Sequence, residues 1–171
     1  IATVDYENIR RIINLSGLSM EKTARTFSKL NEEELRDVII SSLNTHYKGL
    51  ASAEAFRKKG KTDIYILFEN KAAYIAECKI WHGEKNVQEA IDQLFSYITW
   101  RDLKTSLIIF NKENKDFDKL VKVIGDHLSK NPMCQKNIAV NHNEWLCEFK
   151  KDADSTSHIM VQVVVFDICT K

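Results

Sequence analysis

The sequence predicts an α/β protein in which helices cover both faces of a single mixed β-sheet. Two patterns alternate along its 171 residues. Short segments rich in Ile, Val, Phe and Tyr are typical of strands, and longer segments that repeat apolar residues at helical spacing are typical of helices. The continuous apolar run 105–110 indicates a strand that is buried on both faces.

Residues 1–30 are expected to form a separate helical extension. Ile9, Ile12 and Ile13 have the spacing of one helix face. Ser16-Gly17 predicts a break in this helix, because glycine in particular disfavours a helix interior.

The next predicted helix spans residues 31–46, with Asn31 as its N-cap. Leu35, Ile39 and Leu43 form the centre of its apolar stripe. This helix is therefore expected to pack against the sheet.

Glu32 falls within that stripe, where a carboxylate needs an explanation. One explanation is that it serves a site at the edge of the sheet, and the other is a first-turn acid that favours the helix dipole. Because Glu33 and Glu34 follow directly, the sequence does not decide which of the three glutamates serves a site.

The remaining elements are expected to be three strands, a helix, a strand, a helix and two closing strands. Their predicted ranges are 51–57, 62–68, 73–81, 84–100, 105–110, 116–128, 145–149 and 159–168. Gly60 and the polar run 69–71 mark the turns between the first three strands. We expect one domain over residues 1–171, with a core at 31–129 and C-terminal strands at 130–171.

Composition and charge fit a globular protein better than a protein that coats nucleic acid. Charged residues make up 29% of the chain, but they nearly cancel to a formal net charge of +1. Bulk charge therefore does not draw this protein to phosphate. An enzyme with a local basic groove and an acidic metal site remains compatible, because the two charges cancel in the sum.

The cysteines and the hydropathy pattern predict a cytoplasmic protein without a membrane partner. The four cysteines show no CxxC spacing, which argues against a zinc cluster, and scattered thiols suit a reducing compartment. The sequence has no secretory signal and no apolar run long enough to cross a membrane. The chain begins at Ile1, which is compatible with a module cut from a longer protein.

Asp63, Glu77 and Lys79 are the strongest candidates for a functional site, because they stand on two neighbouring predicted strands. Side chains alternate along a strand, so Glu77 and Lys79 share one face while Cys78 points to the other as a core residue. A three-residue hairpin loop places Asp63 on the face of Glu77 and Lys79. A loop of two or four residues turns Asp63 away unless a bulge intervenes.

The arrangement of these three residues suits metal-dependent cleavage of a phosphodiester. Two carboxylates can hold a hard divalent cation through oxygen, and a lysine beside them can activate water or stabilise charge on a phosphate. An acid-x-lysine pair alone is more often a surface salt bridge. Here the pair follows Tyr74-Ile75-Ala76 in an apolar strand, where an exposed ion pair is less natural.

These residues resemble the motif of the PD-(D/E)XK nuclease superfamily. Thr62-Asp63 and Glu77-Cys78-Lys79 have its order, although Thr62 replaces the proline of the motif. The stretch from Gln93 to Tyr97 resembles the QxxxY motif that some members carry. The resemblance covers roughly residues 32–110 and implies a restriction-endonuclease-like fold with the core order α-β-β-β-α-β.

The resemblance implies a magnesium-dependent nuclease, with Mn²⁺ able to substitute for Mg²⁺. Asp63, Glu77 and the backbone carbonyl of Cys78 would hold the metal. Glu32 fits the place of a further acid that members often carry on the first core helix. Lys79 would act on the attacking water.

Nucleic acid is the expected partner, with DNA favoured over RNA. By the same resemblance, Gln93 and Tyr97 would help to position the nucleic acid or the metal site. Lys61 belongs to a basic run just before Asp63 and is expected to contact phosphate, with a solvated turn as the alternative. The segments 60–64 and 77–81 are similar to those of bacterial nuclease-like modules, some of which are linked to phage defence.

Two other classes of function stay open. The fold could hold nucleic acid without cutting it, although a module that only binds has no need to combine Asp63, Glu77 and Lys79. The chain could also be a regulatory or assembly domain, whose N-terminal helices pair with a second copy in a homodimer or with a partner domain upstream.

Overall fold

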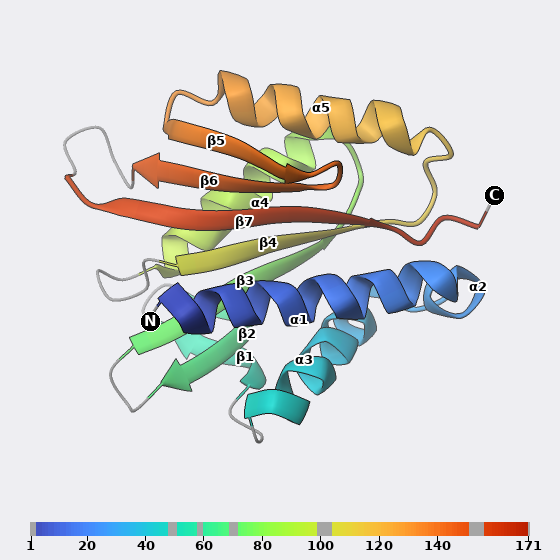
Figure 1. Ribbon diagram of the computed structural model, residues 1–171, viewed down its shortest axis with the longest axis horizontal. Coiled ribbons are helices and arrows are strands. Elements are labelled where there is room, and N and C mark those ends of the chain that lie inside the picture. The colour runs from blue at the N-terminus through green and yellow to red at the C-terminus, as the bar shows by residue number, and fades with distance from the viewer. Residues whose placement is uncertain are drawn as a thin grey trace.

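A computed structural model describes residues 3–47, 51–57, 60–68, 72–98, 104–150 and 156–170, with side chains omitted at 3–4, 52–62, 68 and 72–73. Over these ranges the protein has a mixed α/β fold (Figure 1). The helices are α1 (Thr3–Lys22), α2 (Ala24–Phe27), α3 (Glu32–Tyr47), α4 (Glu84–Tyr97) and α5 (Phe117–Lys130). The strands are β1 (Ala51–Arg57), β2 (Gly60–Phe68), β3 (Ala72–Ile80), β4 (Lys104–Asn111), β5 (Cys134–Asn141), β6 (Glu144–Lys150) and β7 (His158–Asp167).

The described strands form one mixed sheet of seven, in the order β1-β2-β3-β4-β7-β6-β5. The central strands β3, β4 and β7 run parallel, and the other neighbours are antiparallel. From α3 to β4 the chain follows the predicted order α-β-β-β-α-β. The carboxyl ends of β3, β4 and β7 therefore lie along one edge of the sheet.

Helices cover both faces of this sheet, as predicted. Figure 1 shows α1 and α3 in front of the sheet and α4 behind it. The front core joins α1 and α3 to inward side chains such as Ile64, Cys78 and Phe166. The rear core joins α4 and α5 to the opposite set, which includes Ile75 and Leu107.

Helix α3 forms as the sequence predicts. Leu35, Ile39 and Leu43 are fully buried, which confirms the apolar stripe. Asn31 and Glu34 form a capping box: the backbone N–H of Glu34 donates to Asn31 Oδ1 (2.8 Å), and the backbone N–H of Asn31 donates to Glu34 Oε1 (3.1 Å). The predicted N-cap is therefore confirmed.

The break predicted at Ser16-Gly17 is wrong, because α1 continues through both residues. Gly17 serves packing instead. A Cβ built on it would lie 2.1 Å from the ring of Phe166, so only glycine allows the helix to approach β7 this closely. The segment expected as a separate extension packs Tyr6 and Ile9 into the front core.

Strand β5 was not predicted. Its side chains are all half-buried or exposed, so the segment has no buried apolar face to reveal it. It lies at the edge of the sheet and pairs with β6. Of the helices in the described ranges, none combines the length and the hydropathy needed to cross a membrane.

Candidate functional site

The register between β2 and β3 brings Asp63 to Glu77. Their pairing runs from Phe68 opposite Ala72 to Ile64 opposite Ala76, so residues 69–71 connect the strands and lie outside the described residues themselves. The three-residue connection is one of the two predicted possibilities. Continuing the register by one step places Asp63 opposite Glu77.

The three candidate residues share the rear face of the sheet. Tyr65 and Ile75 pack into the rear core, and Asp63, Glu77 and Lys79 stand at even steps from them along the same strands. Cys78 belongs to the front core and is fully buried, as predicted for a core residue. Burial raises the pKa of its thiol, so this sulfur is a poor nucleophile.

Two acidic side chains cap the end of β3 where β2 no longer pairs with it. The backbone N–H of Cys78 donates to Asp63 Oδ2 (2.9 Å), and the backbone N–H of Ile80 donates to Glu32 Oε2 (3.0 Å). The N–H of Trp81, the residue after Ile80, points toward β4 instead. It donates to the carbonyl of Phe110 (2.8 Å). Asp63 and Glu32 thus satisfy backbone donors that the sheet leaves unpaired.

The carbonyl of Cys78 faces the same gap as its N–H. In a strand, the N–H and C=O of one residue point toward the same neighbour. Since the N–H of Cys78 points to Asp63, its carbonyl does too. This geometry leaves the carbonyl available as an oxygen ligand beside the carboxylates.

Glu77 is the most unusual residue of the site. Its side chain is fully buried, and no hydrogen bond of standard geometry reaches either carboxyl oxygen within the described residues, although Asp63 lies close enough to interact with it. Burial, followed by the nearby Asp63 carboxylate, raises the pKa of Glu77 to about 9, although Lys79 acts in the opposite direction. A buried carboxyl group without a partner is costly, and a bound cation would remove that cost.

Lys79 lies two residues beyond Glu77 and is half-buried. Within the described ranges it makes no ion pair of salt-bridge length. Its charge still lowers the pKa of Glu77, so the ammonium group lies near that carboxyl. These observations disfavour the surface salt bridge as the reason for the acid-x-lysine pair.

The three consecutive glutamates at the start of α3 have separate environments. Glu32 reaches β3, as described above, and Glu34 closes the capping box with Asn31. Glu33 is exposed to solvent. Of the three, Glu32 is therefore the one placed to serve the site.

Asp63 and Glu77 form a pair of acids rather than a complete metal cage. In the part of the chain that the structure describes, no three His, Cys, Asp or Glu side chains form a ready metal-binding group. Mg²⁺ does not need one, because it keeps several waters and commonly binds through one or two carboxylates plus substrate phosphate. The unpartnered oxygens of Glu77 fit such a cation.

Of the residues predicted to contact nucleic acid, the structure describes the side chains of Gln93 and Tyr97 but not that of Lys61. Gln93 Nε2 donates to the hydroxyl of Tyr97 (2.8 Å), and α4, which carries both residues, packs against β2 and β3. No hydrogen bond joins this pair to the acids within the described ranges. Lys61 lies in β2 opposite Phe56, and its side chain is outside the described part.

Arg36 belongs to this region, and the sequence reasoning missed it. It lies one helical turn after Glu32 and is 7% exposed, with Nε and Nη2 donating to Asp37 Oδ1 (3.1 and 3.0 Å). Burial raises the pKa of the Cys78 thiol and the charge of Arg36 partly opposes this, so Arg36 lies near the gap beside β3. The signal that points to it is a cation four residues after Glu32 on the same helix face.

Comparisons with family models, curated proteins and solved structures give no match for this chain.

Proposed function

We propose that the protein is a metal-dependent nuclease that hydrolyses phosphodiester bonds of nucleic acid, with DNA as the favoured substrate. The observation that carries this proposal is Glu77, a buried carboxyl group whose oxygens accept no hydrogen bond of standard geometry in the described part of the chain. It lies beside Asp63 and Lys79 on one face of the sheet. Perturbed ionisable groups of this kind concentrate at functional sites.

Asp63 and Glu77 are the residues that would hold Mg²⁺ or Mn²⁺, with the Cys78 carbonyl and Glu32 as further oxygen donors. Bound there, the metal would supply a Lewis acid for the phosphate and lower the pKa of water. The hydrogen bond from the Cys78 N–H holds the carboxylate of Asp63 in position. Glu32 is held by Ile80 in the same way.

Lys79 supplies a cation on the same face as the two acids. Its ammonium group can orient the attacking water by hydrogen bonding and stabilise the charge that grows on the phosphate oxygens. Among the described residues this ammonium group has no ion-pair partner, which suits the role better than a salt bridge would. Gln93, Tyr97 and Lys61 would position the nucleic acid.

The order of elements supports the finer assignment to a PD-(D/E)XK, restriction-endonuclease-like fold. Helix α3 precedes the three antiparallel strands β1 to β3, and α4 then leads to β4, which lies parallel to β3. The acids lie where β2 and β3 separate, at the edge of the sheet where the parallel strands end. Such edges are the usual place for ligands in open α/β sheets.

Cleavage of labelled single- and double-stranded DNA and RNA, with Mg²⁺, Mn²⁺ or EDTA, tests the proposal. We expect cutting with either metal and none in EDTA. Lys79→Ala should slow it by about 10²- to 10⁴-fold. Lys85→Ala is the matched control, because the Lys85 side chain is 91% exposed at the start of α4, where it pairs with the exposed Glu89. Cutting that survives Lys79→Ala at full rate would refute the site.

A module that binds nucleic acid without cutting it is the second candidate. It is favoured by the hydrogen bonds that already engage Asp63 and Glu32 with backbone groups of β3, because capping is a purely structural use of both acids. Calorimetric titration with Mg²⁺ separates the two candidates. A silent module would give no heat of metal binding, and a nuclease would give heat that Glu77→Gln removes.

A further inference from the structure

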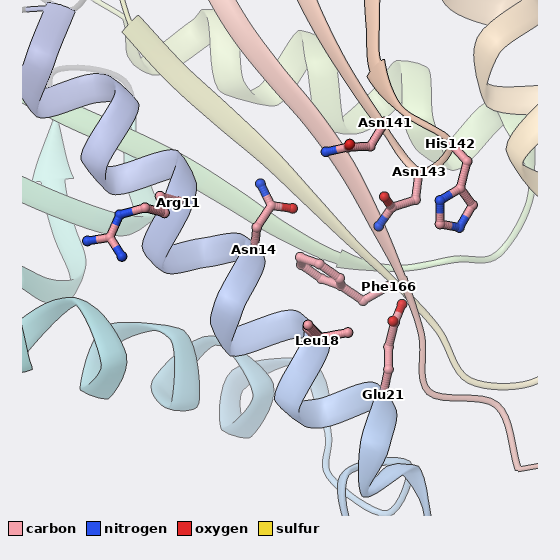
Figure 2. Close-up of a pocket in the computed structure, with 8 residues that line it drawn as sticks. All are labelled: Arg11, Asn14, Leu18, Glu21, Asn141, His142, Asn143 and Phe166. Carbon is pink, nitrogen blue, oxygen red and sulfur yellow. The ribbon is translucent and has the colours of Figure 1, made fainter.

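A pocket of about 400 Å³ lies between α1 and the turn that joins β5 to β6, on the front face of the sheet (Figure 2). Its volume falls in the range of small-molecule sites. Asn14 and Glu21 line it from α1, and Asn141 and Asn143 line it from the turn. None of these residues takes part in the candidate nuclease site.

The three asparagines that line the pocket each use their amide nitrogen in a hydrogen bond to another part of the protein. Asn14 and Asn141 donate through Nδ2 to the two carboxylate oxygens of Glu144 (3.1 Å each), and Asn143 donates through Nδ2 to the carbonyl of Val165 (3.0 Å). Because these partners only accept, they fix the orientation of each amide. The three Oδ1 atoms have no hydrogen-bond partner in the described ranges, so they remain as free acceptors.

Glu21 adds a carboxylate to this set of acceptors. Its Oε1 accepts from the backbone N–H of Asp167 (2.9 Å), and its other oxygen has no partner among the residues described. Figure 2 shows the side chains of Glu21, Asn14 and Asn143 converging on one space, while the guanidinium of Arg11 points away from it. A complementary ligand must therefore bring several N–H donors.

The pocket also has an apolar wall. Leu18, which is 46% exposed, and Phe166 both line it. A flat ring that carries donors along one edge would meet the wall with its face and the oxygens with its edge. The exposed imidazole of His142 also lines the pocket and can donate to a carbonyl oxygen carried by the ring.

We propose that this pocket binds the guanine base of a nucleotide. Guanine presents an imino N–H and an amino group side by side, next to a carbonyl oxygen, and this edge matches carboxylate and amide oxygens beside one imidazole. Adenine sets its single amino group beside ring nitrogens that only accept, and these would face the oxygens of the pocket. Uracil has one donor between two acceptors and fits less well.

The pocket lies on the front face of the sheet and the candidate nuclease site on its rear face, but both lie toward the carboxyl ends of β3, β4 and β7. Ile80, Phe110 and Phe166 lie level on the parallel strands β3, β4 and β7. Two strand spacings, or roughly 10 Å, separate the first from the last. A nucleic-acid strand held at Glu77 would have to cross this edge from the rear face to place a guanosine in the pocket, and this source of the base rests on the proposed function.

Titration calorimetry with GMP, IMP and AMP in EDTA, on the chain with Lys79→Ala, tests the proposal. IMP lacks only the amino group of GMP, so we expect it to bind about tenfold more weakly, the usual effect of one lost hydrogen bond. AMP should bind more weakly still. Equal affinity for GMP and AMP, or no binding of GMP, would overturn the proposal.

Three variants tie the binding to this pocket. Leu18→Trp should abolish GMP binding by filling the space, whereas Leu15→Trp should not, since Leu15 is 55% exposed on the same helix and does not line the pocket. Glu21→Gln keeps an oxygen for the Asp167 N–H and loses the carboxylate, so GMP affinity should fall about tenfold. Thermal unfolding establishes that each variant is folded, and full GMP binding by folded Leu18→Trp would contradict the assignment.

A single-stranded oligonucleotide with one guanosine, compared with the same strand carrying inosine, distinguishes the two sources of the base. A weaker inosine strand indicates that the pocket reads the bound nucleic acid, and equal binding of both strands indicates a free nucleotide. Because EDTA and Lys79→Ala remove cleavage from these titrations, a failed nuclease assay leaves the GMP result standing. Absence of GMP binding likewise leaves the nuclease proposal intact.

Discussion

The carboxylate of Asp63 accepts a hydrogen bond from the backbone N–H of Cys78, over 2.9 Å, at the point where β2 stops pairing with β3. The side chain thus replaces the strand that would otherwise satisfy this N–H. One consequence is mechanical, because the bond fixes an acid directly beside Glu77. The other is electrostatic, because the fixed charge of Asp63 helps to raise the pKa of Glu77.

Binding of Mg²⁺ at pH 7 should release about one proton per chain. The pKa of Glu77 is raised to about 9 by burial and then by Asp63, so the carboxyl group holds a proton that a cation must displace. Calorimetric titrations in two buffers of different ionisation enthalpy count the protons released. Identical heats in both buffers would mean that Glu77 does not bind the metal as a carboxylate that loses its proton.

Without metal, the protein should become less stable as the pH rises from about 4.5 to about 9, because Glu77 titrates near the first value in the unfolded chain and the second in the folded one. Within this window the folded state holds the extra proton, so the free energy of unfolding falls with pH. The slope contributed by Glu77 is at most roughly 1.4 kcal/mol per pH unit. Urea unfolding of the wild type and Glu77→Gln across this pH range measures the slope. If the free energy of unfolding of both proteins changed with pH in the same way, the raised pKa of Glu77 would be contradicted.

Two substitutions of Glu32 separate its roles as a cap and as a ligand. Glu32→Gln keeps an oxygen for the Ile80 N–H, so stability should hold while metal-dependent cleavage falls about tenfold or more. Glu32→Ala leaves the N–H without its partner and should also lower the free energy of unfolding by about 1–3 kcal/mol. Glu33→Ala, at an exposed neighbour, is the control. If Glu32→Gln cleaved at the full rate, Glu32 would serve only to accept the hydrogen bond from Ile80 and would not bind metal.

Features set by local sequence were predictable. The cap at Asn31 and the buried stripe of α3 follow from residue type and helical period, and both are found. The alternation that sends Cys78 to the core and Glu77 to the other face follows from the strand period. A three-residue loop was sufficient to place Asp63, because it fixes the register of the hairpin.

Features set by distant contacts were not predictable. Ile80 and Glu32 lie 48 residues apart, and no local pattern shows that a helix acid will meet a backbone N–H there. Arg36 sits near Cys78 only because α3 packs across β3. Strand β5 carries no buried residue, so its pairing with β6, rather than its own pattern, makes it a strand.

The wrong prediction at Gly17 also came from a distant contact that the sequence does not show. Substitution of Gly17 tests directly how α1 packs on the sheet. The sequence treats a glycine in a helix as a weak point, but here the missing side chain makes room for Phe166, whose ring would lie 2.1 Å from an added Cβ. Gly17→Ala should therefore lower the free energy of unfolding by about 1–3 kcal/mol through overpacking. Gly125→Ala is the matched control in α5, where an added Cβ would meet Trp145 at 3.5 Å, an ordinary contact. That substitution should raise stability by about 0.5–1 kcal/mol, the usual helix preference for alanine, and equal effects of the two in urea unfolding would show that Phe166 yields to the methyl group.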